Sequence, residues 1–130
     1  MIGMFAEHSS GFLRVVAVIT LLAFSIPISI APLLWARTFR WTVDAQPNLA
    51  LYFGRSLGVV AVVLSWAAWH VASQPSLQPF FFKMLIGVTA LMVVVHTVGA
   101  WQKVQPWTET AEIPFWGGLA VLGLLFYPAA

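Results

Sequence analysis

The sequence predicts an all-α membrane protein, folded as an antiparallel bundle of four transmembrane helices. Hydrophobic types make up 61% of the 130 residues and charged types only 8%, whereas soluble proteins carry about 25% charged residues. Six basic and four acidic side chains are too few to cover the surface of a soluble domain this small. The composition therefore excludes a soluble globule, a disordered chain and a nucleic-acid binder, and it makes the lipid bilayer the first partner.

Long gaps between charged residues indicate the four predicted helices, which form a single domain over residues 1–130. They lie at about 12–36, 49–72, 80–101 and 113–129. A spanning helix needs about 20 apolar residues, because the hydrocarbon core is about 30 Å thick. The fourth segment is the shortest, and we expect it to span because no soluble core exists to receive it. Since backbone groups at membrane depth must be paired internally, a helix bundle is the expected solution.

The first helix shares two features with a signal peptide: Arg14 precedes its apolar run, and small residues occur late in the run. The run is long, and the candidate cleavage site Ser29–Ile30–Ala31 is directly followed by Pro32, so we expect the segment to be retained. Pro27 and Pro32 predict a kink, because each lacks a backbone donor and clashes with the preceding turn. The hydroxyls of Ser25 and Ser29 are candidate partners for the freed carbonyl groups.

Polar connections that contain proline separate the helices. They are residues 37–48, 73–79 and 102–112. Short connections make consecutive helices antiparallel neighbours. In the last connection, Thr108 or Thr110 is a candidate cap for the fourth helix, and Glu109 and Glu112 are favourable near its positive end.

Basic residues predict the orientation through the positive-inside rule. The two sides carry Arg37, Arg40, Arg55 and Lys103 against Arg14 and Lys83. This difference places the two longer connections in the cytoplasm and both termini outside, while cytoplasmic termini remain the competing expectation. We expect a bacterial inner (cytoplasmic) membrane, with tryptophans near the helix ends, Trp116 among them, as interfacial anchors.

Small residues recur at helical spacing along the second helix. Gly54 and Gly58 form a GxxxG pattern, which Ala61 and Ser65 continue. Such a stripe allows close approach of two helix backbones. Its partner is either another helix of this chain or another subunit.

Ionisable residues inside the second and third helices predict a polar cluster at one end of the bundle. Its expected members are Tyr52, Arg55, Thr89, His96, Lys103, Glu109 and Glu112. Thr89, His96 and Lys103 recur every seven residues and so share one helix face. We expect Arg55 to pair with Glu109 or Glu112 and His96 to be hydrogen-bonded among them. The alternative is that Arg55 extends to the lipid headgroups and His96 bonds a carbonyl or threonine oxygen.

No catalytic, metal or cofactor pattern is found in the sequence. The chain has no cysteine, which excludes disulfides, thiolate metal sites and cysteine nucleophiles. His70 and His96 differ in depth by about 21 Å at helical rise, so they cannot ligate one haem together. Glu109 and Glu112 have no HxxE or ExxH companion, and we predict no metal site and no cofactor.

Three functional hypotheses remain. The first is a non-catalytic accessory or assembly subunit of a membrane complex, working with other membrane subunits. The second is a homo-oligomeric binding or transport protein for a lipid-like hydrophobic ligand in a pocket near Arg55 and His96. The third is an enzyme acting on a lipid or quinone with His96 and a glutamate as acid–base pair, and the lack of a catalytic motif makes it the least favoured.

Overall fold

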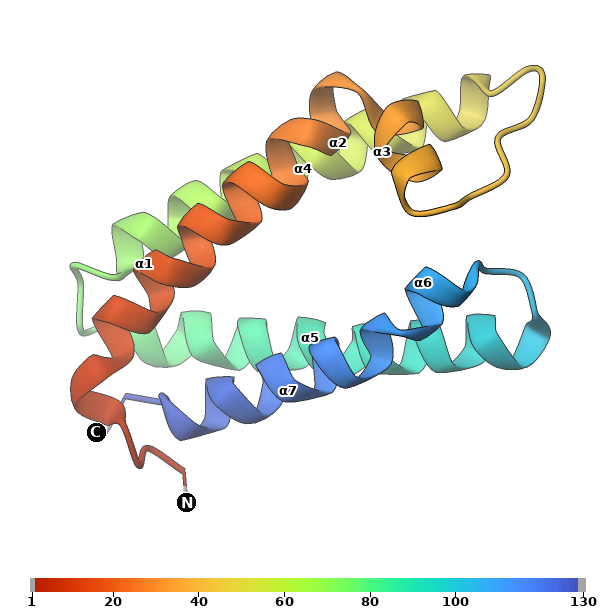
Figure 1. The fold of residues 1–130 in the computed structure, drawn as a ribbon. Coiled ribbons are helices and arrows are strands. Elements are labelled where there is room, and N and C mark those ends of the chain that lie inside the picture. The colour runs from red at the N-terminus through yellow and green to blue at the C-terminus, as the bar shows by residue number, and fades with distance from the viewer. Residues whose placement is uncertain (1, 129–130) are drawn as a thin grey trace. The chain divides into compact units, whose positions relative to one another are not determined.

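The protein is all-helical in the computed structural model, which describes residues 2–128 and contains no strand among them. Three helical segments are long and apolar enough to cross a membrane: Ala6–Ile30, Asn48–Val71 and Gln78–Gln102. Each has 24 or 25 residues and is therefore about 36 Å long, which exceeds the thickness of the hydrocarbon core. The chain thus has the elements of a membrane protein. Figure 1 shows the order of the helices.

The fourth predicted span is shorter than expected. It corresponds to α7, Glu112–Leu125, which has 14 residues and is about 21 Å long. A separate single turn, α6 (Trp107–Thr110), precedes it. Three helices rather than four therefore reach spanning length in the described chain, and a four-helix bundle in one domain stays a prediction.

The described chain divides into two compact units, with the division inside the segment Ala6–Ile30 and at the end of α4, Asn48–Val71. The first unit contains the residues up to Phe12 and those from Val71 onward. The second runs from Leu13 to His70.

The second unit begins with a helix that changes geometry twice. α1 (Ser9–Thr20), which starts in the first unit, is followed by a π-helical turn, Leu21–Ser25, and by α2, Ile26–Ile30. The helix stops at Ala31, where φ is −133° and ψ is 60°, and α3, Pro32–Thr38, starts anew. The predicted segment of about 12–36 is therefore divided at Ala31, where a kink is expected from Pro27 and Pro32, and its first helix begins earlier than residue 12. The break has a local cause, because a proline pushes the residue before it out of the α region.

The small-residue stripe of α4 (Asn48–Val71) lies against this interrupted segment of the same chain. A Cβ atom at Gly54 would lie 2.5 Å from the Pro32 Cβ atom, and one at Gly58 would lie 2.5 Å from the Ser29 backbone nitrogen. Farther along α4, the Ser65 hydroxyl oxygen is 3.3 Å from that of Ser25. The stripe therefore packs against another part of the same chain.

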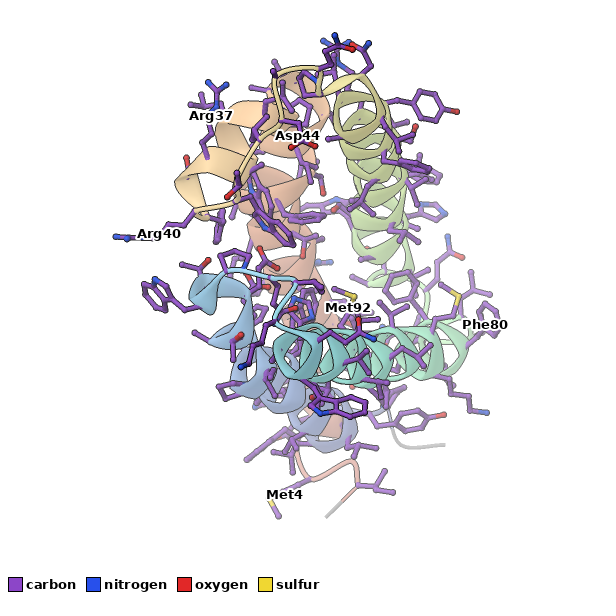
Figure 2. The ribbon with its side chains drawn as sticks, turned by 90° about the vertical axis from the view of Figure 1, so that its right-hand side faces the viewer. Met4, Arg37, Arg40, Asp44, Phe80 and Met92 are labelled. Atoms are coloured by element: carbon purple, nitrogen blue, oxygen red, sulfur yellow. The ribbon has the colours of Figure 1, made fainter. Side chains whose placement is uncertain are left out.

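The connection that leads from α3 to α4 is polar. Figure 2 shows the charged Arg37 near the end of α3, and Arg40 and Asp44 in the connection itself.

The first unit is built on α5, Gln78–Gln102, with α7 packed along it (Figure 1). The two helices approach closely at Gly123, where an added Cβ atom would lie 2.8 Å from Ile86 Cγ1. The chain leaves α5 through Lys103, a left-handed residue with φ of 56°. Pro106 is extended, with φ of −66° and ψ of 160°, and starts α6. This reversal brings the start of α7 back beside the end of α5.

Candidate functional site

His96 is a buried histidine near the C-terminal end of α5. It lies six residues before Gln102, about 9 Å from the helix end, and its side chain is 5% exposed. Met92, one turn earlier, places its carbonyl oxygen 2.8 Å from His96 Nδ1. Because a carbonyl oxygen only accepts hydrogen bonds, Nδ1 carries a proton in this contact. The orientation of the ring and one of its two protonation sites are therefore defined by the helix itself.

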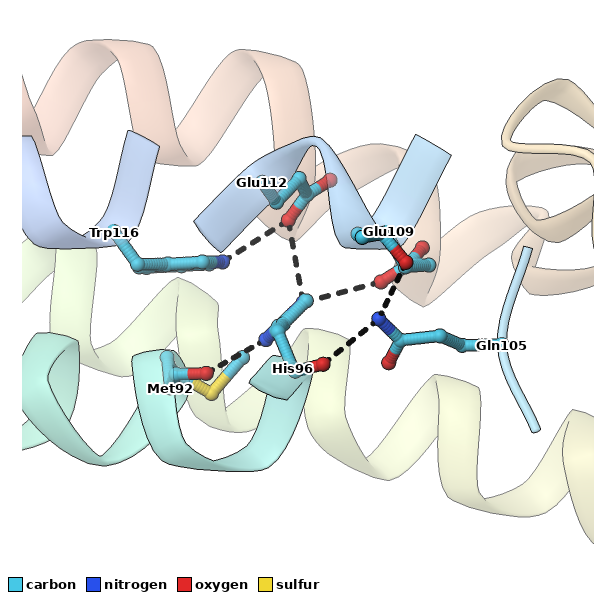
Figure 3. Close-up of polar contacts among 7 residues, drawn as sticks. Met92, His96, Gln105, Glu109, Glu112 and Trp116 are labelled. Atoms are coloured by element: carbon cyan, nitrogen blue, oxygen red, sulfur yellow. Dashed lines mark hydrogen bonds and ion pairs between the residues drawn. The ribbon is translucent and has the colours of Figure 1, made fainter. Parts of the chain in front are cut away.

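Two glutamates from α6 and α7 face the other ring nitrogen (Figure 3). Glu109 Oε2 is 3.2 Å and Glu112 Oε2 is 3.6 Å from His96 Nε2. The Glu109 side chain is 11% exposed and that of Glu112 is 24% exposed. One oxygen of each carboxylate and the imidazole nitrogen all lie within 4.8 Å of one another. We call these three side chains the His96 centre.

The turns around residue 106 bring both acids to the histidine. Pro106 accepts from the backbone amide of Glu109 at 3.1 Å, which forms the first turn of α6. Ala111 donates to the Trp107 carbonyl oxygen at 2.9 Å, and α7 begins at the next residue. Glu112 thus occupies the first turn of α7, where the positive end of the helix favours a carboxylate.

Two further side chains hold the His96 centre in place (Figure 3). Trp116, one turn after Glu112 on α7, donates from Nε1 to Glu112 Oε2 at 3.0 Å. Gln105 donates from Nε2 to the His96 carbonyl oxygen at 2.9 Å and to the Thr110 hydroxyl at 3.1 Å. Gln105 therefore ties α6 to α5, and Trp116 sets the direction of the Glu112 carboxylate.

The three ligand atoms of the His96 centre repel one another unless a positive charge lies between them. With Nδ1 protonated, a neutral imidazole presents a lone pair on Nε2 to the carboxylate oxygens, which also carry only lone pairs. Two carboxylates at a separation of at most 4.8 Å repel each other by at least about 3 kcal/mol at an effective dielectric constant of ~20. A proton or a metal cation between these atoms offsets this repulsion.

The surroundings of Glu112 also disfavour a second negative charge in the His96 centre. Burial raises the pKa of the Glu112 carboxyl above its ordinary value, and the nearby charge of Glu109 raises it further. The Trp116 hydrogen bond and the His96 imidazole act in the opposite direction. The anionic form of Glu112 is therefore disfavoured unless it gains a positive neighbour.

The structure brings three members of the predicted cluster together, and two more, Thr89 and Lys103, belong to the same unit but lie outside the His96 centre. Thr89 is buried on α5, where its hydroxyl donates to the carbonyl oxygens of Leu85 and Ile86, at 2.9 and 3.0 Å. Lys103 is the exposed residue that ends α5. Tyr52 and Arg55 belong to the second unit, and the predicted pairing of Arg55 with Glu109 or Glu112 stays a prediction.

Gln105 and Trp116 belong to the site, although the sequence analysis does not predict them there. It predicts Trp116 only as an interfacial anchor, although the spacing of four residues from Glu112 puts both on one face of a helix. Gln105 carries no such signal, because its role depends on the turn at Lys103. The convergence of the three side chains on one point has no spacing signal either, since they come from three separate helices.

Comparisons with protein-family models, with curated proteins and with solved structures find no match for this chain. The chemistry of the His96 centre is therefore the main indication of function.

Proposed function

We propose that this protein is a small, non-catalytic membrane protein that binds a metal cation at the His96 centre. One observation carries the proposal: a buried imidazole nitrogen and two carboxylate oxygens converge within 4.8 Å. An ionisable group inside a membrane-spanning segment is costly and usually serves a function, and His96 lies inside the candidate span Gln78–Gln102. A single proton bridges one donor and one acceptor, whereas a metal cation contacts all three ligand atoms at once.

Cation binding is tested by thermal unfolding of the metal-depleted protein in detergent, with a panel of mono- and divalent chloride salts. A cation that binds only the folded protein stabilises it by about 2.7 kcal/mol at 100 times its Kd. We expect at least one cation to raise the melting temperature by several degrees, and His96→Gln to abolish the rise.

A matched control exists in the same chain. His8 lies beside Glu7 at 3.4 Å, but their side chains are 66% and 79% exposed. His8→Gln should leave the cation-induced rise intact, because an exposed pair does not enclose an ion. If no metal cation stabilises the wild-type protein, a shared proton satisfies the His96 centre and the proposal is overturned.

The wider role that we propose is that of an accessory or assembly subunit, with a self-associating binding protein as the alternative. The small size and the lack of a catalytic motif support a non-catalytic role. Purification in mild detergent followed by native mass spectrometry separates the two. Co-purified membrane subunits support the first, and a defined homo-oligomer supports the second.

A second candidate is binding of a lipid-like ligand beside Arg55. An open hollow of about 570 Å³ follows one face of α4, and its lining includes Tyr52, Arg55 and Ser56. All of its lining residues belong to α4 and none to the His96 centre. An exposed arginine at this place favours an anionic headgroup with its acyl chain along the helix.

Lipid binding at this hollow predicts a loss of retained anionic phospholipid in Arg55→Gln. One basic residue near a membrane surface contributes about 1 kcal/mol, which corresponds to roughly fivefold weaker retention. Lipids extracted from purified protein are quantified by mass spectrometry, with Arg37→Gln of the same unit as the control. Equal retention by wild type and Arg55→Gln would exclude this second candidate.

A further inference from the structure

The tautomer of His96 determines which atom is available for a ligand. Because Nδ1 donates to the Met92 carbonyl oxygen at 2.8 Å, only Nε2 offers a lone pair. Metal-ligating histidines typically donate their other ring N–H to a carbonyl or carboxylate oxygen in this way. Imidazole nitrogen is a ligand for zinc, copper, iron and nickel, whereas calcium and magnesium prefer oxygen ligands. The His96 ligand therefore selects against the hard cations.

The spacing of the ligand atoms fits a small metal ion. A tetrahedral site with bonds of about 2.1 Å has edges of about 3.4 Å between ligand atoms. The two edges that start at His96 Nε2 measure 3.2 Å to Glu109 and 3.6 Å to Glu112. The third edge, between the two carboxylate oxygens, is at most 4.8 Å.

Hydrogen bonds from Trp116 and Gln105 also hold the ligand residues in place. Trp116 donates to the Glu112 oxygen that faces the histidine, at 3.0 Å. Gln105 fixes the α6 turn against the His96 carbonyl oxygen at 2.9 Å. Such outer contacts orient ligands and raise metal affinity. A cluster that existed only for packing would not need both acids directed at the same nitrogen.

We propose that the cation is a divalent transition metal of the zinc class, bound by His96 Nε2 and by one carboxylate oxygen each of Glu109 and Glu112. This inference rests on the cation-binding function proposed above. Three protein ligands leave a fourth position of the tetrahedron for water or for a group from a partner, as in zinc sites that are not closed. Trp116 and Gln105 act as positioning residues.

Cobalt(II) is a suitable probe, because it replaces zinc in tetrahedral sites and absorbs visible light there. Metal-depleted protein in detergent is titrated with Co²⁺, and Zn²⁺ is then added as a competitor. We expect a saturable visible absorption at one equivalent of Co²⁺, its loss on adding Zn²⁺, and its absence in His96→Gln and Glu109→Gln. His8→Gln serves as the control and should bind like the wild type.

Trp116→Phe tests the positioning role without removing a ligand. Loss of an outer-shell hydrogen bond typically lowers metal affinity by about 10- to 100-fold. We expect Trp116→Phe to raise the Kd for Co²⁺ by this factor with one equivalent still bound at saturation. An unchanged Kd would show that Trp116 has no role in positioning Glu112.

A measurement on the wild-type protein covers the case in which a ligand variant does not fold. X-ray absorption of the zinc-loaded protein should show nitrogen and oxygen ligands only, with the scattering pattern of one imidazole. A spectrum without an imidazole overturns the proposed ligand set. If Na⁺, Mg²⁺ or Ca²⁺ stabilises the protein while Co²⁺ and Zn²⁺ do not bind, the zinc-class proposal fails and cation binding stands. If no cation binds, both fail.

Discussion

His96→Leu is expected to lower the free energy of unfolding by about 3–5 kcal/mol, the usual cost of removing one member of a buried ion pair. The substitution removes the imidazole that lies between Glu109 and Glu112, whose side chains are 11% and 24% exposed. It leaves two carboxylates within 4.8 Å of each other. Unfolding is measured in mixed micelles by far-ultraviolet circular dichroism on metal-depleted protein.

A second substitution separates repulsion from lost packing. If the two acids repel each other after the loss of His96, Glu112→Gln in the His96→Leu background recovers part of the stability, as a double-mutant cycle detects. His8→Leu, at the exposed pair with Glu7, should change stability by no more than about 0.5 kcal/mol. Equal losses at His8 and His96 would contradict the account of a buried centre.

Gly58→Ala is expected to destabilise the protein by about 1–3 kcal/mol, because an extra methyl group in a tight contact forces neighbouring atoms to shift. The added Cβ atom would lie 2.5 Å from the Ser29 backbone nitrogen, and backbone atoms move less readily than the end of a side chain. Thermal unfolding in detergent provides the measurement.

Gly87→Ala is the matched control for this substitution. Nothing lies within 4 Å of a Cβ atom at Gly87, and alanine is favoured over glycine in a helix interior by about 1 kcal/mol. The same chemical change should therefore have opposite signs at the two positions. A neutral or stabilising Gly58→Ala would show that α4 does not pack closely on Ser29.

Sequence-based predictions agree with the structure where the physical cause is local. The predicted segments 49–72 and 80–101 correspond closely to α4 and α5, since lipid solubility and helix length depend on consecutive residues. In the first segment, the kink expected from Pro27 and Pro32 is a break at Ala31, whereas hydropathy alone extends the helix to residue 36. The expected fourth span corresponds to α7, whose 14 residues do not reach spanning length.

The small-residue stripe is also predicted by the sequence in part, because the close contact is predicted and its partner is not. The pattern from Gly54 to Ser65 indicates a close helix contact, because small side chains permit one wherever a partner exists. Spacing along one helix does not name the partner. The structure places Ser29 and Pro32 of the same chain there.

Hydropathy and charge along the chain are enough to predict a helical membrane protein and to place His96, Glu109 and Glu112 in one polar cluster. They do not predict which atoms of the cluster face each other. The folded chain shows that both acids meet at His96 Nε2. That meeting depends on the left-handed turn at Lys103, with φ of 56°, which reverses the chain and returns the acids to α5. His96 and Glu109 are 13 residues apart in the sequence. Their contact depends on the turn between them, and helical periodicity along one element does not predict it.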